Sequence, residues 1–402
     1  MSFQQGLSGL NAAAKNLDVI GNNVANSGTV GFKQSQAQFA DVYANSLTGA
    51  GGSQVGIGVQ VAAVAQQFTQ GNITSTNNPL DIAINGGGFF RMDNGGEITF
   101  QRNGQFQLDR NGFIVGSGGA FLTGYTADAN GVLSTGAPAP LFINTADITP
   151  QVTTGIDSVL NLDSTKSALP AAGFNQNDPT TFHNSTSVSI YDSLGNAHTL
   201  QTYYVKTAAG AWSVFASTDG APATSVGALN FNTDGTLTTA MPLSTSVAVT
   251  TGASTPFAVD IDFTGTTQFG SSFSVNKLTQ DGYTSGRLAG FSVGDNGIIQ
   301  GRYTNGQSAV LGQVVLASFA NPNGLQPLGN NMWSDTATSG APLIGTPDSG
   351  SLGVLQSSAV EDSNVDLTAE LVNMITAQRV YQANAQTIKA QDAVLQTLVN
   401  LR

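Results

Sequence analysis

Cysteine is absent from this chain of 402 residues, so it can form neither a disulfide bond nor a thiolate metal site. Charge is also scarce, because only 9% of the residues are Asp, Glu, Lys or Arg, against about 25% in ordinary soluble domains. The 25 acidic residues outnumber the 13 basic ones and give a net charge of -12. Nucleic-acid affinity depends on Lys and Arg neutralising phosphates. We therefore expect no nucleic-acid partner.

Long apolar runs are missing as well. No stretch reaches the roughly 18 consecutive apolar residues that indicate a membrane-spanning helix. The N-terminus, MSFQQGLSGLNAAAKNL, has neither the basic region nor the continuous apolar region of a secretory signal peptide. We therefore expect no membrane insertion and, if the protein leaves the cell, export without a Sec signal peptide. The length allows about two or three domains with cores of their own.

Both ends of the chain carry a periodic apolar pattern that the middle lacks. Apolar or small residues recur in alternating steps of four and three, which is the spacing of a coiled-coil seam. Near the N-terminus they are Phe3, Leu7, Leu10, Ala14, Leu17, Gly21 and Val24. Near the C-terminus they are Leu367, Leu371, Met374, Tyr381, Ala385, Ile388, Leu395 and Val399. The pattern predicts one helix at each end, each with one apolar face.

The C-terminal segment is the stronger helix former. No Gly or Pro occurs from Ser363 to Arg402. The Ser363-Asn-Val-Asp366 sequence has the spacing of a capping box, acidic residues come early and basic residues come late, as the helix dipole favours. This predicts one helix of about 35 residues, roughly 50 Å long at a rise of 1.5 Å per residue.

The N-terminal segment is weaker alone. Gly6, Gly9 and Gly21 each cost about 1 kcal/mol relative to Ala in a helix interior, so the segment needs a partner along its apolar face. One interpretation pairs it with the C-terminal helix in a two-helix rod. The alternative, which the pattern leaves open, is that both helices pack on a globular core of the same chain.

Between the ends, the sequence is typical of short strands and tight turns. Asn-Gly pairs at 103–104 and 111–112 separate short alternating runs, which predicts a β-meander. The same device recurs at 296–297 and 305–306. An alternating segment around the turn at Gly195-Asn196 predicts a further β domain.

The sequence thus predicts a mainly β fold with α-helical termini. Pro- and Gly-rich stretches suggest where the chain crosses between domains. The predicted divisions are a terminal helical assembly domain (1–45 with 360–402), an extended linker or hinge (46–79), a β domain (80–145 with 284–359) and an inserted outer β domain (146–283).

Candidate sites for chemistry are few. The only histidines, His183 and His198, accompany no cysteine and no HExxH motif, and we expect both at the surface or at a strand edge. Asp260 and Asp262 would share one face of a strand, but their alternation with Val and Ile is typical of a half-solvated strand. INGGGFF lacks the Lys-Ser/Thr of a P-loop, and no G-x-S-x-G elbow occurs. We therefore predict no catalytic, cofactor-binding or metal site, and no enzyme.

Two terminal motifs carry a family resemblance. The segment NLDVIGNNVANSGTVGFK, residues 16–33, ends the first seam with Asn residues and restarts at Gly-Phe-Lys. It resembles the signature of the axial proteins of the bacterial flagellum, the rod and hook subunits. SNVDLTAELVNMITAQRVYQANAQTIKAQDAVLQTLVNLR is similar to the partner signature of that family.

The middle of the chain resembles the hook subunits in particular. The segments concerned are PLDIAINGGGFF, RNGQF, DSLGNAHTL and VLGQVVLASFANPNGLQPLGNNMW. The resemblance covers most of the chain and is least at 160–180 and 216–280. The loop at 46–58 varies in length within the family, so no contact is carried over to it.

The resemblance implies a structural subunit without cofactors that polymerises into the hook, a tube that acts as a universal joint between rod and filament. Asn22, Asn23, Asn26, Gly31 and Phe32 would form a cap and hinge that turns the chain outward. The implied assembly seam comprises Leu7, Leu10, Leu17, Val24, Leu367, Leu371, Met374, Tyr381, Ile388 and Leu395.

The implied partners are other copies of the chain, the rod, the hook cap and the hook-filament junction proteins. The flagellar type III export apparatus would deliver the chain to the extracellular flagellum. Two alternatives remain. A distal rod subunit would share the terminal signatures, although the inserted domain makes this chain long for one. A secreted β-rich adhesin or polysaccharide-active enzyme would suit the acidic, Gly-rich composition.

Overall fold

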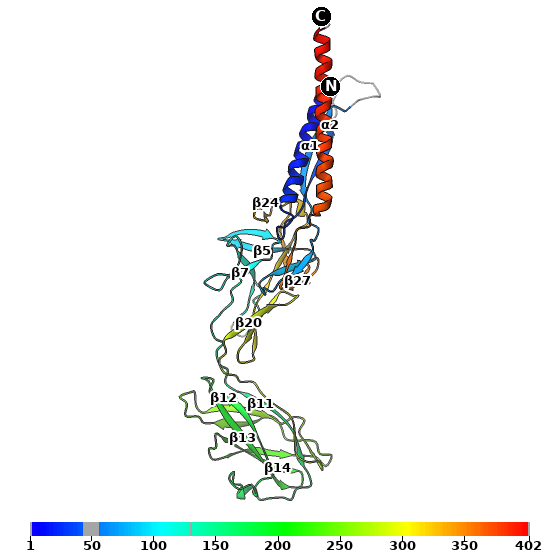
Figure 1. The fold of residues 1–402 in the computed structure, drawn as a ribbon. Helices are drawn as coiled ribbons and strands as arrows, with labels where there is room; N and C mark the ends of the chain where they lie inside the picture. Colours follow the sequence, from blue (N-terminus) through cyan, green and yellow to red (C-terminus); the bar gives the residue numbers. More distant parts are fainter. Residues whose placement is uncertain (1, 43–55, 129–130, 401–402) are drawn as a thin grey trace. The chain divides into compact units, whose positions relative to one another are not determined.

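The computed structural model describes residues 2–42, 56–128 and 131–400. The chain divides into two compact units (Figure 1). Unit 1 comprises Met1–Asn144, Gly290–Gly301 and Ser308–Arg402, and unit 2 comprises Thr145–Ala289 and Arg302–Gln307. Most of the loop at 46–58 lies outside the described residues.

Unit 1 contains both helices and many short strands. Its elements before unit 2 are α1 (Ser2–Ala25), β1 (Ser35–Val42), β2 (Gly58–Gln66), β3 (Ile73–Ser75), β4 (Ile82–Asn85), β5 (Phe89–Asn94), β6 (Glu97–Gln101), β7 (Phe106–Leu108), β8 (Ile114–Gly116), β9 (Phe121–Thr126) and β10 (Ala139–Pro140). The chain continues after unit 2 with β20 (Leu288–Val293), β21 (Ile298–Tyr303), β22 (Ser308–Val314), β23 (Leu316–Ser318), η2 (Pro322–Gly324), β24 (Gln326–Gly329), β25 (Met332–Ser334), β26 (Leu343–Gly345), β27 (Val354–Ser357), β28 (Ala359–Glu361) and α2 (Leu367–Asn400).

Unit 2 is built from strands and one short 3-10 helix. Its elements are β11 (Gly155–Asp163), η1 (Ala171–Gly173), β12 (Asn184–Tyr191), β13 (Ala197–Ala208), β14 (Ala211–Thr218), β15 (Thr224–Asn230), β16 (Leu243–Val247), β17 (Phe257–Asp262), β18 (Thr267–Phe269) and β19 (Ser274–Gln280). The mainly β fold with helical termini is confirmed.

Helices α1 and α2 lie side by side, although they come from opposite ends of the sequence (Figure 1). The cap of α2 differs from the predicted one. Asp366 is the capping residue, because its Oδ1 accepts hydrogen bonds from the backbone nitrogens of Thr368 (2.9 Å) and Ala369 (3.1 Å). The Ser363 hydroxyl instead accepts from the Val365 nitrogen, in a turn before the helix. The predicted start at Ser363 is therefore too early.

Strands β1 and β2 form an antiparallel pair, with Ser35 opposite Gln66 and Val42 opposite Gly58. Both strands contact α1. Residues 58–66, which the sequence analysis assigned to an extended linker, are thus a paired strand against the first helix.

The large sheet of unit 1 combines strands from both predicted stretches. β5 pairs with β6 and β23, β25 pairs with β6, and β22 pairs with β9. The predicted meander is wrong in one pairing, because β6 lies between β5 and β25 whereas β7 pairs with β8. Tertiary contacts with β25 replace the local hairpin after Asn103-Gly104. An aromatic cluster that includes Phe89, Phe100 and Trp333 packs on this sheet.

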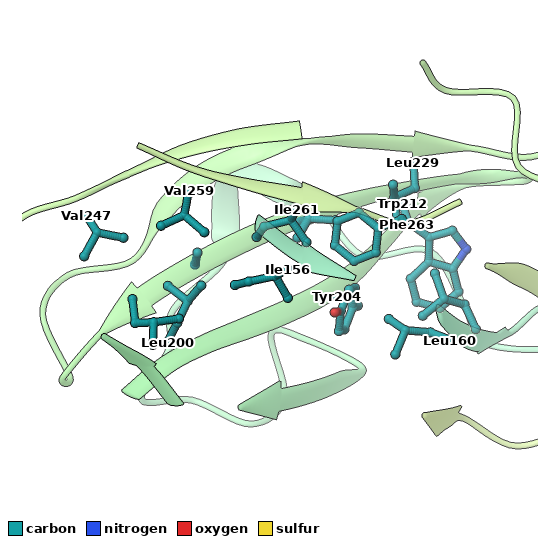
Figure 2. Packing of buried hydrophobic residues seen from close by; sticks show 14 of the residues in the cluster. Ile156, Leu160, Leu200, Tyr204, Trp212, Leu229, Val247, Val259, Ile261 and Phe263 are labelled. Carbon is teal, nitrogen blue, oxygen red and sulfur yellow. The ribbon is translucent and has the colours of Figure 1, made fainter. Parts of the chain in front are cut away.

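Unit 2 is a sandwich of two sheets. One sheet has the order β12-β13-β14-β15, and the other contains β16, β17, β11 and β18 with β19 paired to β11. Tyr204 and Trp212 from the first sheet share one buried cluster with Ile156, Leu160 and Ile261 from the second (Figure 2). Unit 2 therefore has a hydrophobic core of its own.

The chain enters and leaves unit 2 through adjacent segments. Ile148 forms an antiparallel bridge with Gly286, and Gln151 forms one with Tyr283. The first and last segments of this unit are thus held together by backbone hydrogen bonds.

Candidate assembly site

The two terminal helices approach closely through small residues. A β-carbon built on Gly6 would lie 3.1 Å from Ile388 Cγ1, and one on Gly9 would lie 2.7 Å from Asn384 Oδ1. Side chains at these two positions of α1 would push the helices apart. The glycines that weaken α1 as an isolated helix therefore permit its close contact with α2.

The predicted seam residues fall into two groups. Five are exposed, namely Leu7, Leu367, Leu371, Tyr381 and Leu395. Five are half-buried, namely Leu10, Leu17, Val24, Met374 and Ile388. Within one chain, the seam residue Ile388 lies against Gly6, and Asn384 lies against Gly9. Sequence reasoning treated the glycines as a weakness and missed their part in packing.

Further large apolar residues are exposed on the helices. Phe3 on α1 and Val372, Ile375, Val380 and Val394 on α2 all have more than two fifths of their surface accessible. Together with the exposed seam residues they leave α2 with apolar surface along much of its length. Large contiguous apolar patches often mark interaction sites, so these exposed residues are candidates for contacts with other copies.

A cleft of about 790 Å³ lies between α1, the β1–β2 pair and the first half of α2. Ala12, Ile20 and Ala377 contribute apolar lining. Glu370 is buried in its wall, where Oε1 accepts a hydrogen bond from Gln34 Nε2 at 2.6 Å. The other oxygen, Oε2, has no hydrogen-bond partner in the described chain. The cleft therefore has apolar lining residues beside a carboxylate that is itself buried.

Asn23 joins the end of α1 to the start of β1. Its side chain is buried, Nδ2 donates to the Ser35 carbonyl at 2.8 Å, and Oδ1 accepts from the Ser35 nitrogen at 2.9 Å. Asn22 is exposed, and its carbonyl accepts from the backbone nitrogen and from Nδ2 of Asn26. The Asn-rich segment thus ends α1 in two ways: the buried Asn23 side chain hydrogen-bonds to the Ser35 backbone, and Asn22 and Asn26 form a local turn.

Gly31 and Phe32 fix the chain after this turn. Gly31 has a φ of +71°, its nitrogen donates to the Glu361 carbonyl at 2.8 Å, and a β-carbon there would lie 2.5 Å from the Asn103 nitrogen. Only glycine suits this combination of positive φ and close backbone approach. Phe32 is buried beside it.

Lys33, Glu361 and Arg102 form a buried ion cluster. Lys33 Nζ lies 2.6 Å from Glu361 Oε1, and Arg102 Nη1 lies 3.1 Å from Glu361 Oε2, with at most 4% of any of these side chains exposed. Burial lowers the pKa of Lys33 and that of Arg102, and in each case Glu361 opposes the shift. The sequence pattern predicts no role for these three residues beyond the place of Lys33 in the Gly-Phe-Lys restart. No local pattern marks these residues in the sequence, because each one alone is typical of a solvated surface.

Asn364 adds a second polar link at the same place. Its Oδ1 accepts from the Gln34 nitrogen at 2.7 Å, and its Nδ2 donates to the Gln67 carbonyl at 2.8 Å and to Thr69 Oγ1 at 2.9 Å. The opening signature, the segment after β2 and the closing signature therefore meet in one hydrogen-bonded junction.

His198 was predicted at the surface or at a strand edge, and it lies near the start of β13 but is not at the surface. It is buried in unit 2, with Nδ1 at 2.6 Å from Asp219 Oδ2 and Nε2 at 3.2 Å from Asp192 Oδ2. Burial opposes its charge, but the hydrogen bonds to Asp219 and Asp192 outweigh burial and raise the pKa of His198. The surface alternative is wrong because hydrogen bonds to two carboxylates hold the ring in a buried position.

His183 is half-buried and faces backbone groups. Its Nδ1 accepts from the Lys206 nitrogen at 3.1 Å, and Nε2 lies 2.8 Å from the Ser167 carbonyl. Over residues 2–42, 56–128 and 131–400, no three His, Cys, Asp or Glu side chains gather in a way that could hold a metal ion. In the same residues, neither helix has an apolar stretch that could cross a membrane.

Four family models match successive parts of the chain. The flagella basal body rod protein model matches residues 3–33, and the FlgE/F/G hook protein D1 domain model matches 83–156. The FlaE D2 domain model of flagellar basal body proteins matches 161–283, and the C-terminal model of the FlgEFG rod proteins matches 356–401.

Full-length relatives decide the family. The chain is 44% identical to the flagellar hook protein FlgE of Salmonella typhimurium over 411 residues, with 100% of both chains covered. The chain belongs to the flagellar hook protein family. It is also 43% identical to FlgE of Escherichia coli K12, with full coverage of both chains. FlgE of Brucella suis is 32% identical, with 100% of this chain and 98% of the relative covered.

A solved hook protein supports the fold. The crystal structure of Helicobacter pylori FlgE2 matches with a TM-score of 0.55 and 13% identity, and the match covers 72% of this chain and 100% of that one. The full-length identities to FlgE confirm the resemblance of the sequence to hook-type axial proteins.

Proposed function

We propose that this chain is the structural subunit of a flagellar hook and that it acts by self-assembly, without catalysis. The full-length identity to flagellar hook proteins is the observation that carries the proposal. The exposed apolar residues of α1 and α2 support it, since contacts with neighbouring copies would bury them. In this proposal, the terminal helical domain holds the tube together at the predicted seam.

The composition suits a tube that bends while it transmits torque from rod to filament. Only 9% of the residues are charged, so polar surfaces of neighbouring copies can slide without breaking many ion pairs. Unit 2, with its separate core, would form an outer layer of the tube. The hook would thus act as a universal joint.

The proposed partners are other copies of the chain, the rod, the hook cap and the hook-filament junction proteins. The type III export apparatus would carry the chain to the extracellular flagellum. A chain without cysteine supports passage in an unfolded state, because no disulfide bond can fix a folded form before export.

A distal rod subunit is the second candidate. The models of rod proteins match both ends of the chain, at 3–33 and 356–401. A rod subunit would use the same helices for assembly but would form a straight, stiff tube.

Electron microscopy of the purified chain after incubation at high concentration tests the proposal. We expect hollow tubes that bend. Straight, rigid tubes would favour the rod subunit, and dispersed monomers at every concentration would contradict assembly by this chain alone and favour a secreted adhesin or enzyme.

A further inference from the structure

Three passages of the chain border the helices and the β1–β2 pair. The first, at residues 30–34, joins α1 to β1, the second follows β2 at 67–72, and the third precedes α2 at 361–366. Only the second and the third lead to the remaining strands of unit 1, so any rotation of the helix pair against these strands must deform these two passages and shift the first one against them.

All three passages meet at Glu361. Its Oε1 accepts from Lys33 Nζ at 2.6 Å in the first passage and from the Gly71 nitrogen at 2.9 Å in the second. Its backbone carbonyl accepts from the Gly31 nitrogen at 2.8 Å. Glu361 itself ends β28, where it lies opposite Ile73 of β3.

Arg102 connects this point to the large sheet. Its Nη1 donates to Glu361 Oε2 at 3.1 Å, and its Nη2 donates to the Gly86 carbonyl at 2.8 Å. Arg102 also lies over the Phe89 ring, 5.4 Å from its centroid. Lys33 has a second acceptor in the Thr69 carbonyl at 2.8 Å. Each cation is thus held by Glu361 and by one backbone carbonyl.

The type of contact at this junction determines how well it resists rotation of the helix pair against the strands. Apolar contacts are non-directional and permit rotation, whereas charged hydrogen bonds require particular distances and angles. Buried ion clusters add little net stability over apolar replacements of similar volume, but removal of one partner leaves an uncompensated charge. A buried cluster at the crossing of three segments therefore restricts orientation more than it stabilises the fold.

We propose that Glu361 is a positioning residue that locks the terminal helices to the strands of unit 1 against rotation. The inference rests on the proposed hook function, in which torque must pass between helices and strands of each subunit. The junction of Gly31, Lys33, Gly71, Arg102 and Glu361 is then a rigid coupling. The flexible hinge predicted from the Asn-rich segment would have to lie elsewhere.

Distance measurement by pulsed electron spin resonance tests the coupling, because the chain has no native cysteine to interfere with labelling. One label goes on the exposed end of α1, through Ala25→Cys, and the other on the exposed β8–β9 turn, through Ser117→Cys. A pair at Ser117→Cys and Ser351→Cys, both on strand connections of unit 1, is the internal control.

We expect a narrow distance distribution between positions 25 and 117 in the otherwise unchanged chain. Glu361→Gln should increase the width of this distance distribution at least twofold and leave the distribution of the control pair unchanged. Glu97→Gln, at an exposed glutamate, should change neither pair. A broad distribution in the unchanged chain, or a narrow one in Glu361→Gln, would overturn the proposal.

A charge-free triple variant covers the case in which Glu361→Gln fails to fold. Lys33→Met, Arg102→Met and Glu361→Leu together remove all three charges and keep apolar volume, so unit 1 should fold. We expect near-normal melting but a distribution that remains broad. A narrow distribution in this variant would show that packing alone positions the helices. The monomer suffices for these measurements, so a failure to form tubes would contradict the hook function without affecting the test of Glu361.

Discussion

The backbone of Gly6 in α1 lies directly against the side chain of Ile388 in α2, and a β-carbon on Gly6 would lie 3.1 Å from Ile388 Cγ1. The helix pair thus depends on the absence of a side chain. In contrast, among the described residues no atom outside the local helix backbone lies within 4 Å of a β-carbon built on Gly21 of the same helix.

These two glycines should respond in opposite ways to substitution. Gly6→Leu gains helix propensity of about 1 kcal/mol but forces Ile388 away, at an overpacking cost of about 1 to 3 kcal/mol. Gly21→Ala gains about 1 kcal/mol without a clash. Thermal melting of the helical circular dichroism signal should fall for Gly6→Leu and rise for Gly21→Ala. A rise in both would mean that the helices do not pack as described.

Gly31→Ala should destabilise unit 1, because Gly31 combines positive φ with a β-carbon position only 2.5 Å from the Asn103 nitrogen. Positive φ alone costs about 1 to 3 kcal/mol in a residue with a side chain, and the backbone contact adds to it. Gly28→Ala is the matched control, since a β-carbon there meets no atom within 4 Å. Chemical denaturation followed by Trp333 fluorescence should show a lower midpoint for Gly31→Ala only.

Leu371→Asp tests the assembly seam. Leu371 is 45% exposed, so a carboxylate there should leave the melting of the monomer nearly unchanged. In a tube it would place an unpaired charge in each repeated contact, at a cost of several kcal/mol per subunit. Electron microscopy should show no tubes, whereas the exposed control Lys389→Asp should still assemble.

Ile388→Asp should behave differently from Leu371→Asp. Ile388 contacts Gly6 within the chain, so the charge should lower the melting temperature of the helix pair before any assembly. A monomer that melts normally with Ile388→Asp would place this residue in contacts between copies instead.

His198 should make the stability of unit 2 depend on pH. Its pKa is raised by Asp219 and Asp192 against the effect of burial, so its stabilisation is present below about pH 6.5, the ordinary value. The stabilisation is lost as pH rises through the folded pKa. In a Trp333→Phe background, Trp212 fluorescence should report a melting temperature that falls across this range.

His198→Gln should remove the fall in the melting temperature of unit 2 as pH rises. His183 offers a control of opposite sign, since burial lowers its pKa. The stability that His183 contributes is present above the ordinary histidine pKa and is lost as pH falls through the folded pKa. His183→Gln should therefore alter only the acidic part of the pH profile of the melting temperature. An unchanged pH profile in His198→Gln would contradict the role of the two carboxylates.

Removal of residues 149–285 should leave a chain that still assembles. Ile148 and Gly286 form a backbone bridge, so a short Gly-Ser link can join the remaining ends, and unit 2 takes its own core with it. We expect tubes with altered curvature or bending stiffness. Loss of assembly in a variant whose unit 1 remains folded would contradict an outer-layer position for unit 2.

The sequence was most informative where a local pattern decides the structure. Uninterrupted helix formers predicted α2 to within a few residues, and the Asn-Gly pairs at 296–297 and 305–306 gave the turns between β20, β21 and β22. The seam pattern alone could not tell whether Leu371 faces its own chain or another copy. Apolar periodicity shows that a face needs burial but not what buries it.

Contacts between distant segments could not be predicted. β6 pairs with β25, which follows more than 200 positions later, and no local signal at Asn103-Gly104 indicates that choice. The cluster of Lys33, Arg102 and Glu361 is equally hidden, because each residue alone is typical of a solvated surface. His198 is buried between Asp219 and Asp192, which hydrogen-bond to its two ring nitrogens. The sequence around His198 does not show that these carboxylates come together there.

The separation of 328 positions between Lys33 and Glu361 has a consequence for the order of folding. Neighbouring strands such as β12, β13 and β14 pair through local hairpins, which form early because little chain must be closed. The junction cannot form until synthesis has passed Glu361, near the end of the chain. A chain that ends before Glu361 can therefore fold its hairpins but cannot form the junction beside the helix pair, through which we propose that the subunits assemble.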